Sequence, residues 1–134
     1  MKTLKTRTLT WHHLHQPASA DLKWLERHFG LHGLVLDELT HPTTRPRVDN
    51  FGDYLYLVLH FPIFDQPERK THPREIDFVL TKRELITVTH ETIGPLEDFF
   101  KKCSTDKSCK ELFTSKTPAH LLFHVLKELY AFAL

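Results

Sequence analysis

Six consecutive apolar residues, YLYLVL at positions 54–59, form the longest hydrophobic run of this chain. His60 and Pro62 follow at once, so the run falls far short of the roughly 20 residues that an apolar helix needs to cross a bilayer. A short run of aromatic and branched residues predicts a strand over residues 54–61, and its lack of polar alternation predicts burial of both faces. A strand buried on both faces needs helices on each side of its sheet.

Further strands are predicted at residues 8–14, 75–80 and 85–89, and a loop at 65–73. The residues TLTWHHL at 8–14 are rich in β-branched and aromatic types and stop near His15. Residues 75–80 and 85–89 are mainly apolar, and the polar residues between them predict a hairpin. The charged, proline-containing segment 65–73 predicts an exposed loop before that hairpin.

Amphipathic spacing predicts helices around these strands. Apolar residues recur every three or four positions over 21–30 and again over 32–40. A third helical stretch begins after residue 94, with a lysine-rich break around Cys103, and a last helix opens at residue 117 and runs to the end of the chain. This alternation predicts an α/β fold, a layered α/β/α domain with a mixed central sheet, made by all 134 residues as one domain.

Composition and charge exclude several classes of function. Lys and Arg number 18 against 17 for Asp and Glu, which leaves no excess of positive charge to bind nucleic acid. Polar residues rather than an apolar segment follow the basic start, so no secretory signal is expected. Cys103 and Cys109 lack zinc-knuckle and redox spacing and are expected to be reduced thiols. The sequence has no glycine-rich phosphate loop and no zinc-protease motif, so no enzymatic activity is expected.

Three blocks of the sequence carry a resemblance to a known family. The blocks are FGLHGLVLDEL at 29–39, RPRVD at 45–49 and DYLYLVL at 53–59. In order and spacing they resemble the CorA family of magnesium and cobalt transporters, and the likeness extends over nearly the whole chain. The resemblance implies the N-terminal cytoplasmic domain of such a transporter, which is a homopentamer held in the membrane by helices outside this sequence.

The same resemblance sets expectations for location and assembly. Members of the family have a cytoplasmic funnel, a long stalk helix and two transmembrane helices joined by a loop that begins Gly-Met-Asn. Met1 is the only methionine of this sequence, so that loop is not part of it. The last helix, with its uncapped apolar end, is expected to lead toward the stalk. We therefore expect a domain at the cytoplasmic face of the membrane whose partners are neighbouring subunits, and which alone is a monomer or weak oligomer.

Asp37 and Glu38 are the predicted metal ligands. By the resemblance they occupy the acidic pair that binds regulatory magnesium between subunits, and carboxylates suit the hard Mg²⁺ ion. Adjacent residues of a helix point about 100° apart, so a facing subunit is needed to complete the site. Such a site would sense intracellular divalent cation and control the pore. The alternative is that both are solvated acids on the polar side of an amphipathic helix.

The 11 histidines raise a second metal hypothesis. On a strand His13 and His15 share one face, and on a helix His120 and His124 are neighbours at i and i+4. Imidazole favours Zn²⁺ or Co²⁺ over Mg²⁺, which would fit a zinc-transporting branch of the same superfamily. Histidines that only form hydrogen bonds are the competing interpretation. A free-standing metal-binding or protein-interaction module is the alternative from another functional class.

Overall fold

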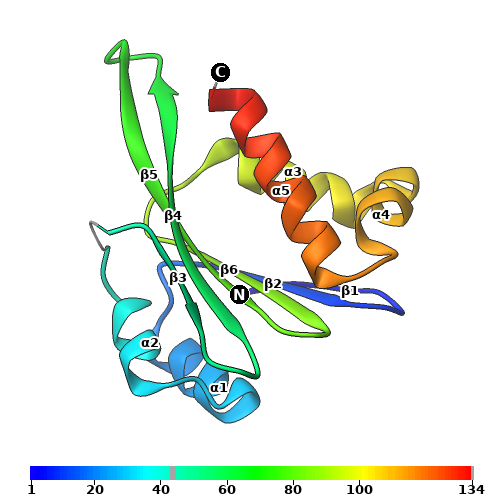
Figure 1. Cartoon of the computed structure of the whole chain (residues 1–134). Coiled ribbons are helices and arrows are strands. Elements are labelled where there is room, and N and C mark those ends of the chain that lie inside the picture. Colours follow the sequence, from blue (N-terminus) through cyan, green and yellow to red (C-terminus); the bar gives the residue numbers. More distant parts are fainter. Residues whose placement is uncertain (43–44, 134) are drawn as a thin grey trace.

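A six-stranded sheet forms the centre of the molecule (Figure 1). The computed structural model describes residues 1–42 and 45–133. The strands are β1 (Lys2–Lys5), β2 (Thr10–His15), β3 (Arg47–Asn50), β4 (Leu55–Asp65), β5 (Lys70–Leu80) and β6 (Glu84–Thr89). Their order across the sheet is β1-β2-β6-β5-β4-β3, in which β2 and β6 run parallel and the other neighbours antiparallel. The predicted mixed sheet is therefore confirmed.

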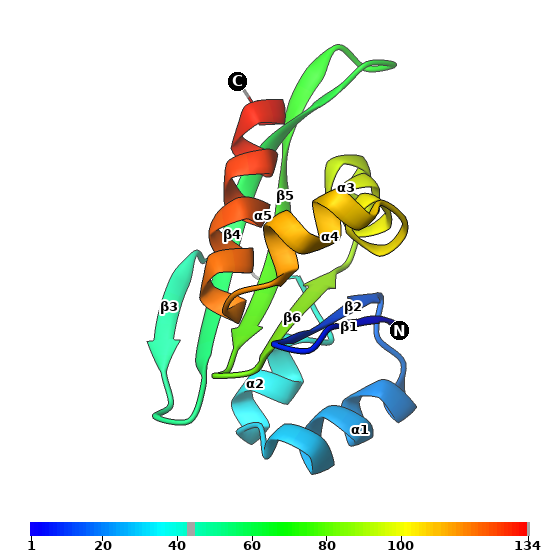
Figure 2. The same cartoon turned by 90° about the vertical axis from the view of Figure 1, so that its right-hand side faces the viewer.

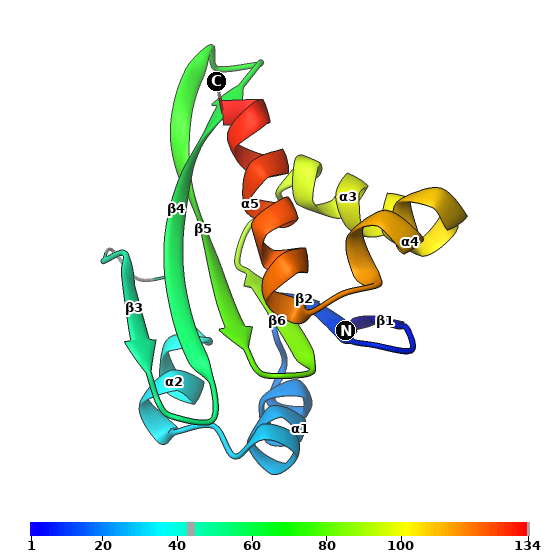
Figure 3. The ribbon, with the colours of Figure 1, turned by 45° about the vertical axis from the view of Figure 1, so that its right-hand side comes forward.

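Helices cover both faces of this sheet (Figures 1 and 2). The helices are α1 (Ser19–Phe29), α2 (Gly33–Glu38), α3 (Gly94–Thr105), α4 (Lys107–Thr114) and α5 (Pro118–Ala133). Figure 3 shows α1 and α2 on one face and α3 and α5 on the other, with α4 beside them. The expected α/β/α layering is confirmed. Across residues 1–42 and 45–133, none of the helices is both long and apolar enough to span a bilayer. Leu134, which the last helix is predicted to include, lies outside the described residues.

Each face of the sheet has its own hydrophobic core. The core under α3 and α5 includes Leu9, Trp11, Phe61, Ile76, Phe78, Leu85, Ile93, Leu96, Phe99, Phe100, Cys103, Leu121 and Val125. The core under α1 and α2 includes Leu14, Leu25, Leu31, Val35, Leu39, Tyr54, Tyr56, Val58, Val79, Ile86 and Val88. Strand β4 contributes to both, since Tyr56 and Val58 belong to the second core and Phe61 to the first. The predicted burial of both faces of this strand is thus confirmed.

The β4–β5 hairpin is longer than the sequence suggests. The predicted loop over 65–73 is confined to the turn at 66–69, because the antiparallel ladder continues to Asp65 opposite Lys70. Among the described residues, β3 and β6 do not pair with this outer part, so the hairpin extends beyond the sheet as a two-stranded arm, visible in Figure 1. Pro62 and Pro73 are tolerated there because a free strand edge does not need their missing N–H groups.

Two further elements differ from the sequence prediction. The short strand β1 was not expected, because Leu4 is the one apolar residue of its KTLK sequence; this side chain is buried. The expected helix break around Cys103 is wrong, because that thiol belongs to the buried stripe of α3. The break falls at Asp106, whose carboxylate accepts the N–H of Cys109 and so caps α4.

Candidate metal-binding site

Helix α2, which carries the predicted acidic ligands, is fixed to the domain by its N-terminal end and by its buried side. The His32 side chain accepts the N–H of Leu34 at 3.1 Å and caps the helix, while the His32 N–H donates to the Tyr54 hydroxyl at 2.9 Å. Val35 and Leu39 are buried in the core beneath. These contacts leave the opposite side of the helix at the surface.

The structure gives the two predicted ligands different surroundings. Asp37 is exposed, whereas Glu38 is partly buried and forms an ion pair with the guanidinium of Arg47. Arg47 is itself shared, because its Nε lies 2.8 Å from a carboxylate oxygen of Asp49 and its guanidinium lies over the Tyr56 ring at 5.4 Å. A cation at Glu38 therefore competes with an arginine held by three neighbours, whereas the Asp37 carboxylate is directly accessible.

A hollow of about 650 Å³ lies beside this ion pair, between α2 and β3. Its lining residues are Leu34, Val35, Glu38, Arg45, Pro46, Arg47, Asp49 and Phe51. Two acids and two arginines are among them, so the hollow has no dominant charge and by itself selects neither a cation nor an anion. Asp37 is not part of the lining.

The histidines of β2 are held in hydrogen bonds. His13 and His15 share a face of the strand as predicted, and each contacts the threonine opposite it on β6. Nδ1 of His13 lies 2.8 Å from the Thr87 hydroxyl and Nε2 lies 2.8 Å from a carboxylate oxygen of Glu97, so both ring nitrogens are engaged. Burial lowers the pKa of His13, which keeps the ring neutral. This histidine has no nitrogen left for a metal unless one of these bonds breaks.

The two histidines of α5 do meet. Nε2 of His120 lies 3.2 Å from Nε2 of His124, as the i, i+4 spacing predicts. Burial and the adjacent His120 lower the pKa of His124. Within the described part of the chain, no third His, Cys, Asp or Glu joins the two nitrogens. The pair therefore offers two ligands of the three or four that a zinc ion takes from a protein.

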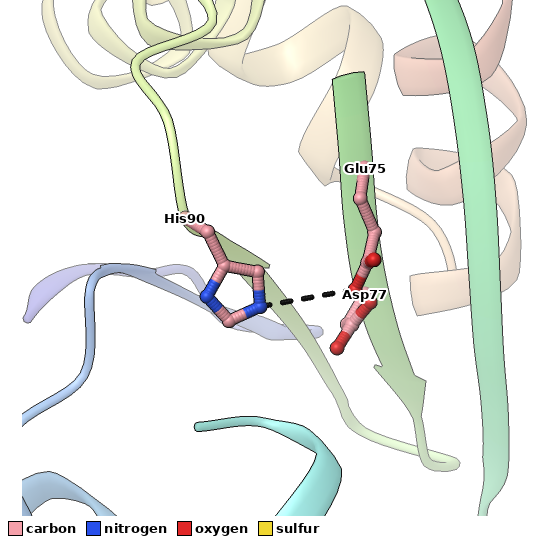
Figure 4. A group of neighbouring side chains, drawn as sticks. All are labelled: Glu75, Asp77 and His90. Carbon is pink, nitrogen blue, oxygen red and sulfur yellow. Dashed lines mark ion pairs between the residues drawn. The ribbon is translucent and has the colours of Figure 1, made fainter. Parts of the chain in front are cut away.

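One group of potential metal ligands was missed by the sequence analysis. Glu75 and Asp77 on β5 lie beside His90, which follows β6 (Figure 4). The available signal was an acid at position 77 between the apolar residues Ile76 and Phe78, since buried carboxylates are rare unless they are paired or bind metal. The contribution of His90 depends on the strand order and was not readable from sequence.

Comparison with known proteins decides the family. Residues 6–131 match the family model described as CorA-like Mg²⁺ transporter protein. This chain belongs to the CorA-like family. The likeness inferred from the three sequence blocks is thereby confirmed. A curated CorA-like relative, the cobalt/magnesium transport protein CorA of Thermotoga maritima, is 30% identical over 70 residues.

Solved structures show that the fold is that of CorA-like soluble domains. The soluble domain of CorA from Methanocaldococcus jannaschii superposes with a TM-score of 0.74 at 20% identity, over 92% of this chain and 48% of that one. The ZntB cytoplasmic domain from Vibrio parahaemolyticus gives 0.70 at 16%, over 94% and 49%. The full-length CmaX protein also gives 0.70, at 17%, over 92% and 36%.

The match covers only a part of each of these relatives. It spans 52% of this chain but 20% of the curated CorA of Thermotoga maritima, and less than half of each superposed chain. At these identities the superpositions establish the fold alone. The family model establishes membership of the CorA-like family.

Proposed function

We propose that this chain is the regulatory domain of a divalent-cation transporter, and that it senses intracellular Mg²⁺ or Co²⁺ through Asp37 and Glu38 at the cytoplasmic face of the membrane. The supporting observation is the family match over residues 6–131, which includes the surface helix that carries both acids. The donor chemistry fits, because both groups supply carboxylate oxygens and the Asp37 side chain is exposed.

The proposed mechanism uses the different surroundings of the two acids. Asp37 makes the first contact with a hydrated ion, and Glu38 contributes when Arg47 shifts its guanidinium toward Asp49. The remaining ligands come from a neighbouring subunit of a homopentamer and from water, since Mg²⁺ keeps several waters in protein sites. When the ion leaves, carboxylates of adjacent subunits repel one another and favour a different arrangement of the subunits.

Zinc handling is the second candidate function. The fold superposes on the ZntB cytoplasmic domain nearly as well as on the CorA soluble domain. The His120 and His124 nitrogens, 3.2 Å apart, are donors that suit Zn²⁺ better than Mg²⁺. Under this alternative the same domain responds to a transition metal, and a subunit contact must supply the missing ligands.

A transport assay tests the magnesium proposal in the membrane-inserted transporter that it requires. Vesicles loaded with a magnesium-sensitive dye report influx while the internal Mg²⁺ concentration is varied. The double variant Asp37→Asn with Glu38→Gln should keep conducting at internal Mg²⁺ concentrations that close the unchanged protein, because the carboxylates that hold the ion are gone.

A matched control removes an exposed acid from the neighbouring helix. Glu26→Gln on α1 removes one surface carboxylate, against two in the double variant, and should leave closure by Mg²⁺ unchanged. Normal closure in the Asp37, Glu38 double variant would refute the proposed ligands. Closure by Zn²⁺ but not by Mg²⁺ in the unchanged protein would favour the second candidate.

A further inference from the structure

A separate group of potential ligands lies on the sheet face that α1 and α2 cover. Glu75, Asp77 and Val79 are every second residue of β5, so all three side chains point to the same face of the sheet. Val79 is part of the core under α1 and α2, which identifies that face. His90 follows β6 and turns toward the two carboxylates, as Figure 4 shows. One donor atom from each of the three side chains lies within 4.8 Å of the others, and Nε2 of His90 is 3.7 Å from Oε2 of Glu75.

Asp77 is buried and Glu75 and His90 are partly buried, and two atoms of the group lack hydrogen bonds. Asp77 is 0% exposed; its Oδ2 accepts the Tyr56 hydroxyl at 3.1 Å. Among the described residues, Oδ1 of Asp77 and Nε2 of His90 are buried atoms without a hydrogen-bond partner. A buried polar atom left in this state costs about 1–3 kcal/mol, and native proteins keep few of them. Each of these two atoms can offer a lone pair, which is what a metal ion requires.

The charge balance of the group also calls for a cation. Glu75 and Asp77 place two carboxylates beside one another on β5, and the guanidinium of Arg47 is already engaged by Glu38 and Asp49. Two carboxylates this close repel each other when both are charged, so a positive charge between them is favourable.

The donor set points to one class of ion. Imidazole nitrogen and carboxylate oxygen are both donors to Zn²⁺ in proteins, whereas Mg²⁺ and Ca²⁺ prefer oxygen alone. We propose that Glu75, Asp77 and His90 bind a transition-metal dication of the Zn²⁺ or Co²⁺ class, at a site distinct from the Asp37–Glu38 pair. This inference does not depend on the proposed regulatory function.

Only a small movement separates the observed geometry from coordination. Two donors about 2.1 Å from one tetrahedral ion are about 3.4 Å apart, so no separation within the group must shrink by more than about 1.4 Å. Rotation about the flexible Glu75 side chain changes its distances to the other two donors without moving the strands. A fourth donor is close, because His60 stands opposite Glu75 on β4 and its Nε2 lies 3.6 Å from Oε1 of that residue.

Cobalt spectroscopy of the isolated chain, freed of any histidine tag, tests the site. Titration with Co²⁺ should produce visible d–d bands that saturate at one ion per chain, and Zn²⁺ should abolish them. Asp77→Asn and His90→Gln should each weaken Co²⁺ binding by about tenfold or more, since even outer contacts of metal ligands contribute that much. His72→Gln, which removes a partly exposed histidine from the same strand, should leave the affinity unchanged.

The outcomes separate this site from the proposed magnesium site and from a purely structural role. Millimolar Mg²⁺ should not displace Co²⁺, and the Asp37→Asn, Glu38→Gln double variant should bind Co²⁺ as the unchanged chain does. Absence of d–d bands, or equal affinity in the unchanged chain and both ligand variants, would overturn the proposal and leave a proton as the buried cation. Circular dichroism checks that each variant is folded; if Asp77→Asn is not, His90→Gln decides, because His90 lies outside the sheet.

Discussion

Replacing Thr87 by valine should destabilise this domain much more than replacing it by serine. The Thr87 hydroxyl accepts the indole N–H of Trp11 at 3.1 Å and lies 2.8 Å from Nδ1 of His13, and all three side chains are buried. All the hydrogen bonds of this series can form together when the Thr87 hydroxyl donates to Nδ1 of His13 and the other ring nitrogen of His13 donates to Glu97. Valine keeps the shape of threonine but removes the hydroxyl between two polar groups.

The expected magnitude follows from the number of groups that lose a partner. Thr87→Val leaves two buried nitrogens unpaired at about 1–3 kcal/mol each, and the added methyl group returns about 1 kcal/mol. The net loss in the free energy of unfolding is therefore about 1–5 kcal/mol. Thr87→Ser keeps both hydrogen bonds and loses one buried methyl, which costs about 1 kcal/mol.

Guanidinium unfolding followed by circular dichroism measures both variants under the same conditions. The same substitution in a Trp11→Phe variant is a further test, because phenylalanine has no indole nitrogen that could lose its hydrogen bond to Thr87. In that background Thr87→Val should cost about 1–3 kcal/mol less than in the unchanged chain. If Thr87→Val costs less than Thr87→Ser, or if the Trp11 background makes no difference, the hydrogen bonds of the Thr87 hydroxyl do not contribute as argued.

Two further predictions concern other buried groups. Burial raises the pKa of Cys103 to about 12, so a thiol reagent at neutral pH should label Cys109 and reach Cys103 only after denaturation; rapid labelling of both would contradict the buried position of Cys103. Burial lowers the pKa of His13, so below pH 6.5 the unfolded chain binds a proton that the folded chain does not, and stability should fall with acidification by at most about 1.4 kcal/mol per pH unit. His13→Gln should reduce this slope in denaturant unfolding between pH 6.5 and 5, and an unchanged slope would show that His13 is not the group responsible.

The parts of the fold that follow from local pattern were predictable. The run at 54–59 predicted a strand with two buried faces, and the spacing of apolar residues predicted helices on both sides. The outer part of the β4–β5 hairpin was not predictable, because prolines and charges usually mark loops. They are compatible with strands there only because of the free edges, a property of the assembled sheet.

In the candidate sites too, local pattern predicted some features, and others depend on how the chain folds. The helix that carries Asp37 and Glu38 was predicted, but the ion pair between Glu38 and Arg47 depends on how the connection to β3 folds back. Glu75 and Asp77 share a face by simple alternation. Their neighbour His90 follows a different strand, β6, so no spacing in the sequence reveals the group.

The parallel pairing of β2 with β6 has a consequence for how the chain acquires its fold. Trp11 lies opposite Leu85, so the middle of the sheet joins the start of the chain to a segment made much later. Closing so long a loop costs entropy before the contact returns any stabilisation, and such contacts slow folding. During synthesis one edge of β2 therefore stays unpaired until β6 has emerged from the ribosome.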